Sequence, residues 1–223
     1  MEIDTHIEIP DLARLLNRNE FRRFSDSGNT KMEDMQIAFQ GLALPRLSYR
    51  MKKIEAIEKK TIRLSGGVTF NSPKLAKVMK YSDDITCFVA TIGNVLDHEV
   101  AWLNNANRLT EAYILDSLGS MVIEHTVNEF HKEMGQRYGK QGKGVTLRFS
   151  PGYCDWPVTD QKKLFLVLDA EQIGVTLNES CLMHPRKSIS GVFGICPVNN
   201  DNPIPPYNPC SECKKKDCVA RRN

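Results

Sequence analysis

Six consecutive residues, Arg148 to Tyr153 (RFSPGY), combine a cation with a turn that a ligand can approach. Pro151 fixes its own φ angle and favours an extended conformation at the residue before it. Gly152 can adopt backbone angles that are closed to other residues, so a ligand can come close to the main chain there. A guanidinium beside such a turn suits a ligand with a carboxylate. From these residues alone, a structural turn with a surface arginine is the favoured interpretation, and a ligand site is the alternative.

Two aromatic residues, Tyr153 and Trp156, follow directly after this turn. Both side chains can stack on a flat ring or pack against a cation. Together with Arg148 they indicate a ligand that carries an aromatic base as well as a carboxylate.

A line of polar residues runs along the longest predicted helix, which extends from Leu109 to about Met134. The polar line consists of Asp116, Ser120, Glu124 and Asn128, at four-residue spacing. A broad apolar face is formed by Leu115, Leu118, Met121, Val122 and Val127. From the residues alone, the polar line is interpreted as the solvated side of the helix, and a ligand contact is the alternative.

Three of the seven cysteines form a C-x2-C-x4-C pattern near the C-terminus. These are Cys210, Cys213 and Cys218, and Cys196 lies thirteen intervening residues upstream of them. Four thiolates in a short segment stiffened by proline suit tetrahedral zinc or an iron–sulfur cluster, and the spacing does not choose between them. A loose tail with unrelated thiols is the alternative. The other three, Cys87, Cys154 and Cys181, are expected to be ordinary buried residues.

The order of predicted elements favours an α+β fold with a mostly antiparallel sheet flanked by helices and followed by a Cys-rich C-terminal loop. Strands are predicted at 61–64, 68–70, 85–91, 145–149, 175–177 and 189–195, and helices at 73–79, 109–134 and 160–173. Residues 1–60 are expected to be helical and polar, with 51–60 as a solvated helix face. We expect one domain in three parts: 1–100, helical and α/β; 101–196, the core; and 197–223, a Pro/Cys-rich tail.

Composition and charge restrict the class of protein. The chain has 223 residues, of which 41% are hydrophobic and 26% charged, which is typical of a globular protein. A net charge of +3 gives no field that indicates nucleic-acid binding. The uncharged run Ile85 to Leu96 is too short to span a bilayer, and the N-terminus does not read as a secretory signal. We therefore expect a soluble, cytoplasmic protein.

Three segments occur here in the order and spacing of a known family: Arg148–Gln161 (RFSPGYCDWPVTDQ), Ile173–Pro185 (IGVTLNESCLMHP) and Ser188–Gly191 (SISG). They resemble the activation, or reactivation, domain of cobalamin-dependent methionine synthase. The predicted helix before them also resembles the family's helix at that place. The family domain binds S-adenosylmethionine (AdoMet) in a shallow groove.

The resemblance implies a set of AdoMet-binding residues: Glu124, Arg148, Ser150, Pro151, Gly152 and Tyr153. It implies that Arg148 binds the methionine carboxylate and that Glu124 is a polar contact from the long helix. An ammonium group favours a carboxylate partner, which agrees with Glu124. The main chain of residues 150–152 would surround the adenosyl part, and Tyr153 would close the loop.

The resemblance further implies a stand-alone activation component of cobalamin-dependent methionine synthase. It would support reductive methylation of cobalamin on a partner, either a methionine synthase or another corrinoid methyltransferase. The chain has no Asp-x-His-x-x-Gly motif to bind a corrinoid itself, so the cobalamin comes from that partner. An electron donor such as flavodoxin or ferredoxin is expected. No catalytic residue is expected, because the cofactors carry the chemistry.

Two alternatives stay open at this point. One is a non-catalytic assembly or interaction subunit that has lost AdoMet binding. The other, which the sequence favours less, is an independent methyltransferase, because the usual Gly-rich donor loop after a first strand is absent.

Overall fold

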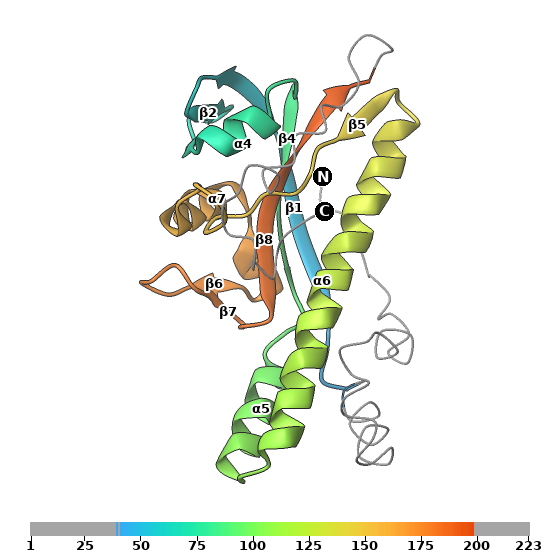
Figure 1. Cartoon of the computed structure of the whole chain (residues 1–223), viewed down its shortest axis with the longest axis vertical. Helices are drawn as coiled ribbons and strands as arrows, with labels where there is room; N and C mark the ends of the chain where they lie inside the picture. The colour runs from blue at the N-terminus through green and yellow to red at the C-terminus, as the bar shows by residue number, and fades with distance from the viewer. Residues whose placement is uncertain (1–38, 40, 199–223) are drawn as a thin grey trace.

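The computed structural model describes residue 39 and residues 41–198, which form a six-stranded sheet with helices on both faces (Figure 1). The strands of this sheet are β1 (Arg46–Ile57), β2 (Thr61–Leu64), β3 (Thr69–Asn71), β4 (Asp84–Thr91), β5 (Lys143–Val145) and β8 (Ser188–Pro197). The helices are α4 (Pro73–Val78), α5 (Val95–Asn105), α6 (Leu109–Gly139) and α7 (Gln161–Val167), with 3₁₀ turns η1 (Val158–Asp160) and η2 (Ala170–Ile173). Two short strands, β6 (Thr176–Leu177) and β7 (Met183–His184), pair with each other.

The strand order in the large sheet is β3-β2-β1-β4-β8-β5, and every neighbouring pair is antiparallel. All eight residues of β4 are buried, because strands pair with both of its edges and side chains cover both of its faces. A strand in this position needs a continuous apolar run, which is the pattern that predicted it. The structure confirms the predicted α+β class and the antiparallel sheet.

Two hydrophobic cores lie on opposite faces of the sheet, because successive side chains of a strand point to opposite faces. From β4, Phe88 and Ala90 enter the core that α5 and α6 cover. Ile85 and Val89 enter the second core, which α4, α7 and Trp156 complete. The segment after Phe149 therefore belongs to one face of the sheet, and the long helix belongs to the other.

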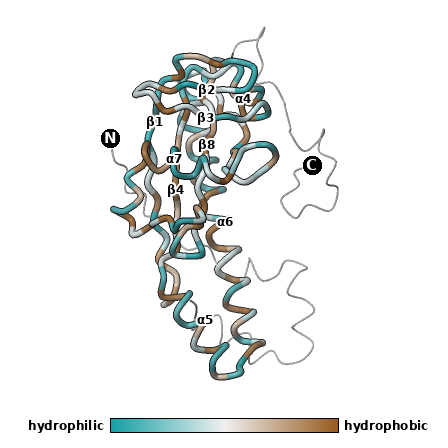
Figure 2. The backbone as a smooth tube through the Cα atoms, turned by 90° about the vertical axis from the view of Figure 1, so that its left-hand side faces the viewer, coloured by the Kyte–Doolittle hydropathy of each residue, from teal (hydrophilic) through white to brown (hydrophobic). Residues whose placement is uncertain are grey.

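α5 and the first part of α6 extend beyond the end of the sheet as a two-helix arm, visible in two views at right angles (Figures 1 and 2). α6 has 31 residues, which corresponds to a length of about 46 Å. Gly119 lies where α6 crosses α5. A Cβ atom at Gly119 would collide with the side chain of Leu96, so this glycine permits the close approach of the two helices.

The prediction for residues 51–60 is wrong. Residues 46–57 form the twelve-residue strand β1, which pairs with β4 on one side and β2 on the other. The buried residues Leu47 and Tyr49 show the two-residue period of a strand. Beyond them the mixed charges of 52–58 hide that period. Lys53 is an example: its ammonium lies 2.8 Å from a carboxylate oxygen of Asp84 on the neighbouring strand.

Other element boundaries differ from the predictions. The predicted strand 145–149 is interrupted: β5 ends at Val145, and Phe149 then forms a single bridge with Val192 of β8. The predicted helix 160–173 is divided into η1, α7 and η2, and it ends at Gly174 in the left-handed conformation, as expected for a terminal glycine. α5 has no counterpart among the predicted elements. Among the described residues, no helix has both the length and the apolar character to cross a membrane.

Candidate functional site

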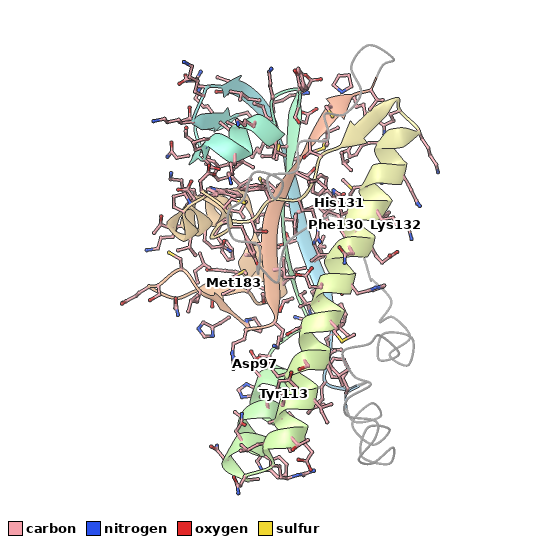
Figure 3. All side chains as sticks on the ribbon, in the orientation of Figure 1. Asp97, Tyr113, Phe130, His131, Lys132 and Met183 are labelled. Atoms are coloured by element: carbon pink, nitrogen blue, oxygen red, sulfur yellow. The ribbon has the colours of Figure 1, made fainter. Side chains whose placement is uncertain are left out.

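The segment that carries Arg148 is attached to the structure on two sides. Toward β8, Phe149 exchanges two backbone hydrogen bonds of 2.8 Å with Val192. Toward α6, the ring nitrogen Nε2 of His131 lies 2.8 Å from the carbonyl oxygen of Thr146. Figure 3 shows His131 on the part of α6 that runs beside the sheet. The backbone around Arg148 is therefore fixed between the helix and the sheet.

The side chain of Arg148 reaches two residues of the polar line on α6. Its Nη2 atom donates a 2.7 Å hydrogen bond to Oδ1 of Asn128 and lies 3.7 Å from Oε2 of Glu124. The Arg148 side chain is 12% exposed, whereas that of Glu124 is 59% exposed. The structure thus brings the predicted residues Glu124 and Arg148 together, as a cation and a carboxylate side by side at the surface.

The turn at residues 150–153 has the conformation that its sequence predicts. Gly152 has a φ angle of +89°, in the region that favours glycine. The amide of Gly152 donates to the carbonyl of Trp156 at 2.9 Å, and the amide of Tyr153 donates to the carbonyl of Ser150 at 3.2 Å. Pro151 is buried, and the ring of Tyr153 is 53% exposed. Tyr153 is therefore an aromatic surface beside an open glycine.

The expectation that Trp156 stacks on a ligand is wrong. Its side chain is 1% exposed and lies in the core beside Phe70 and Phe149, with ring centroids 5.1 and 6.1 Å away. Its indole Nε1 donates a 3.0 Å hydrogen bond to a carboxylate oxygen of Asp160. The chain after the turn folds back onto the sheet, so this aromatic side chain points inward.

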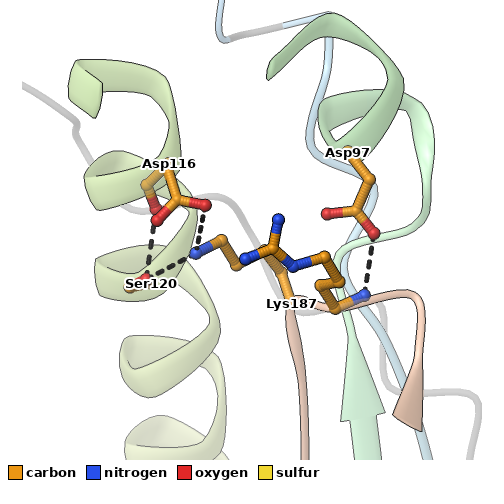
Figure 4. Close-up of polar contacts among 5 residues, drawn as sticks. Asp97, Asp116, Ser120 and Lys187 are labelled. Carbon is orange, nitrogen blue, oxygen red and sulfur yellow. Dashed lines mark hydrogen bonds and ion pairs between the residues drawn. The ribbon is translucent and has the colours of Figure 1, made fainter. Parts of the chain in front are cut away.

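The other half of the polar line meets a second cation, Lys187, in the turn between β7 and β8 (Figure 4). The Nζ atom of Lys187 lies 2.8 Å from a carboxylate oxygen of Asp116 and donates a 2.8 Å hydrogen bond to Oγ of Ser120. The preceding amide, of Arg186, donates a 2.7 Å hydrogen bond to the Asp97 carboxylate on α5. One turn thus connects both helices of the arm.

Sequence reasoning missed Lys187 and His131. His131 follows Glu124 by seven residues, which places the two on the same side of a helix, so the spacing contained a signal for it. Lys187 gave no comparable signal, because nothing near it in the sequence indicates that it faces the distant polar line.

Only one of the four cysteines predicted to bind a metal lies within the described residues. Cys196 is buried, and its Sγ donates to the carbonyl of Gly144 at 3.7 Å. Burial, with a smaller contribution from Asp83, raises the pKa of the Cys196 thiol. The other three, Cys210, Cys213 and Cys218, lie outside the described residues. Among residues 39 and 41–198, no cluster of three or more His, Cys, Asp or Glu side chains could hold a metal ion.

The remaining cysteines divide into two groups. Cys87 and Cys181 are buried, as predicted, and burial raises the pKa of the Cys87 thiol to about 12. The prediction that Cys154 is buried is wrong, because it is exposed next to the turn.

The sequence model of the family described as "Vitamin B12 dependent methionine synthase, activation domain" matches residues 74–200, which is more than half of the chain. This chain belongs to that family. The family match includes α6, the turn at 150–153 and β8, so all of the side chains described above from α6 onward lie within it.

A solved structure supports the fold of this activation-domain family member. The crystal structure of the MetH reactivation domain bound to AdoHcy matches with a TM-score of 0.60 and 15% sequence identity. The match covers 92% of this chain and 80% of that chain. At this identity the likeness shows a shared fold. No curated protein sequence matches this chain.

Proposed function

We propose that this chain binds AdoMet at the Arg148–Glu124 pair and the adjoining turn, and that it supports reductive methylation of cobalamin on a partner protein. The observation that carries this proposal is the cation and carboxylate at 3.7 Å beside the open glycine turn. The amino-acid end of AdoMet has one ammonium and one carboxylate, which complement these two side chains. Membership of the activation-domain family, and a relative crystallised with AdoHcy, support the same ligand.

Each residue has a distinct role in this proposal. The Arg148 guanidinium binds the ligand carboxylate, and the exposed Glu124 carboxylate accepts hydrogen bonds from the ligand ammonium. The distance of 3.7 Å between Arg148 and Glu124 exceeds that of a hydrogen bond, so the ligand can replace a weak attraction by two charge-assisted hydrogen bonds. The main chain of residues 150–152 contacts the adenosyl part, and Tyr153 covers it.

The proposed site residues are suited to positioning AdoMet as the methyl donor. When bound, AdoMet supplies an activated methyl group, and the partner's cobalamin supplies the nucleophile. The chain's own contribution is to bind and orient the donor, which requires no general base. The partner is a methionine synthase or another corrinoid methyltransferase protein, and a flavodoxin- or ferredoxin-like protein delivers the electron.

Titration calorimetry tests the ligand site with two ligands. We expect AdoMet to bind, and Arg148→Ala to weaken its binding by about 1.5–3 kcal/mol, because a hydrogen bond to a charged group is lost. 5′-Methylthioadenosine, which lacks the amino-acid end, should bind both proteins equally. Arg63→Ala is the matched control, since Arg63 on β2 forms an exposed ion pair with Glu55 on β1. Equal AdoMet affinity for wild type and Arg148→Ala would remove Arg148 from the site.

One observation favours the second candidate, an assembly subunit without AdoMet binding. Arg148 already has a 2.7 Å hydrogen bond to Asn128, so the chain itself supplies a partner for the guanidinium. Absence of heat with AdoMet, from protein that unfolds cooperatively, would support this candidate. Stable association with a corrinoid protein under the same conditions would then identify its role.

The C-terminal cysteines form a separate proposal, in which Cys196, Cys210, Cys213 and Cys218 hold zinc or an iron–sulfur cluster. Metal binding needs thiolates, so the ion must overcome the raised pKa of Cys196. Metal analysis and the absorption spectrum distinguish the options. A brown protein with broad absorption in the violet indicates iron–sulfur, and a colourless protein that contains zinc rejects an electron relay. Protein without bound metal would reject both.

A further inference from the structure

A buried carboxylate below the turn has three partners, two from its own segment and one from a distant strand. Oδ2 of Asp160 accepts hydrogen bonds from the indole Nε1 of Trp156 at 3.0 Å and from the backbone amide of Asn71 at 3.1 Å. Oδ1 lies 2.7 Å from Nζ of Lys163. The Asp160 side chain is only 6% exposed. Asp160 therefore connects the segment after the turn to the end of β3.

Trp156 links this carboxylate directly to the turn. Its backbone carbonyl accepts from the amide of Gly152 at 2.9 Å, and its own amide donates to the carbonyl of Tyr153 at 3.0 Å. Its ring lies beside Phe70 and Phe149. Trp156 is thus bonded to Asp160 through its ring and to Gly152 through its backbone.

A second attachment supports the same segment from the other side. The Asp155 carboxylate accepts hydrogen bonds from the hydroxyl of Ser72 and, at 3.1 Å, from the amide of Lys74. Ser72 is the N-cap residue of α4, and its hydroxyl also accepts from the amide of Leu75. The residues after the turn are thus attached to both β3 and α4, whereas Gly152 and Tyr153 face solvent.

We infer that Trp156 and Asp160 are positioning residues that set the main-chain shape of the turn at residues 150–153. This shape determines how well the turn accepts the adenosyl part of the ligand. The effect on affinity depends on the proposed function, whereas the effect on the turn does not. Neither side chain contacts the ligand, because both are buried.

Trp156→Phe is the informative variant, because phenylalanine fills most of the aromatic site and removes the indole N–H. In ligand-free protein we expect NMR to show amide exchange about tenfold faster at Gly152 and Tyr153, as expected when one hydrogen bond to a charged group is lost. Affinity for 5′-methylthioadenosine should fall by a similar factor. Asp160→Asn keeps an acceptor oxygen and should produce smaller changes in the same direction.

Tyr138→Phe is the matched control. It removes a hydroxyl that donates to the sulfur of Met51, from a similarly buried ring at the far end of α6, and should change neither measurement. Unchanged exchange at Gly152 in Trp156→Phe would overturn the inference. Should that variant not fold, unchanged exchange in Asp160→Asn would overturn it equally.

The two readouts separate this inference from the proposed function. Faster exchange without any binding of AdoMet or 5′-methylthioadenosine to the wild type rejects the proposed ligand site and leaves the effect on the turn established. If the wild type binds the ligand, faster exchange in Trp156→Phe together with unchanged affinity for 5′-methylthioadenosine rejects the link between turn shape and affinity.

Discussion

The two halves of the polar line on α6 have the same kind of residues but different geometry. At one end, Lys187 is 11% exposed and lies 2.8 Å from Asp116. At the other end, Arg148 is equally covered, but its distance to Glu124 is 3.7 Å and Glu124 is 59% exposed. The first pair is closed, because its two charges are in direct contact, although Asp116 is 38% exposed. The second pair is open, because its charges are further apart and its carboxylate is the more exposed of the two.

This difference separates a structural contact from a candidate binding contact. A cation in direct contact with its carboxylate, and shielded from water, stabilises the position of the turn that carries it. A carboxylate that remains in water keeps free capacity to accept hydrogen bonds, so a ligand can bind without first breaking a short ion pair. The Lys187 end therefore holds the arm against the turn, and the proposed ligand site is at the Arg148 end.

Among variants that compare the two ends, the largest expected effect on stability is that of Gly191→Ala, at the base of the Arg148 end. A Cβ atom there would lie 2.7 Å from the carbonyl oxygen of Phe149 and 2.9 Å from the hydroxyl of Ser150. Backbone must move, so the free energy of unfolding should fall by about 1–3 kcal/mol, and the affinity for AdoMet should fall too. Urea unfolding and calorimetry measure the two. Gly139→Ala, where no atom lies within 4 Å of the added methyl, should not destabilise the protein.

Glu124→Gln tests whether the open pair binds the ligand ammonium. The change removes the charge but keeps an acceptor oxygen, so AdoMet binding should weaken by about 1–1.5 kcal/mol, with little effect on stability. 5′-Methylthioadenosine binding should not change. An equal loss for both ligands would mean that Glu124 acts on the shape of the groove and not on the ammonium.

Lys187→Met should give the opposite pattern. Methionine retains most of the aliphatic stem and removes the charge. The free energy of unfolding should therefore fall by about 1 kcal/mol, which is the contribution of a partly screened ion pair. AdoMet affinity should stay the same. A substantial loss of affinity in a fully folded variant would show that the closed end also belongs to the ligand site.

Ser120→Ala is expected to have the smallest effect. It removes the hydroxyl that accepts from Lys187, but alanine has the higher helix propensity, so the net change in the free energy of unfolding should be within about 0.5 kcal/mol. A larger loss by urea unfolding would indicate that Ser120 and Lys187 act as one unit, which the double variant with Lys187→Met would measure.

The elements that the sequence predicted well are those that depend on local pattern. β4 and β8 follow from apolar runs, α6 from its long apolar face, and the end of η2 from Gly174. β1 was missed, because mixed charges hide its two-residue period and its pairing with β4 decides its conformation. Of the candidate site, the conformation of the turn at 150–153 was predictable from the local sequence, and the place of Glu124 only from the family resemblance. The inward direction of Trp156 was not, since it depends on the space left by Phe70 and Phe149.

The sequence by itself determined the chemical groups: a guanidinium before a glycine turn, and four polar side chains at helical spacing. The tertiary structure decided which cation meets which half of that line, and how closely. Lys187 and Ser120 are 67 residues apart in the chain, and Arg148 and Asn128 are 20 apart. Such contacts form only when the sheet and α6 pack together, because packing fixes the distance between charges, and this distance determines whether a pair is closed or open.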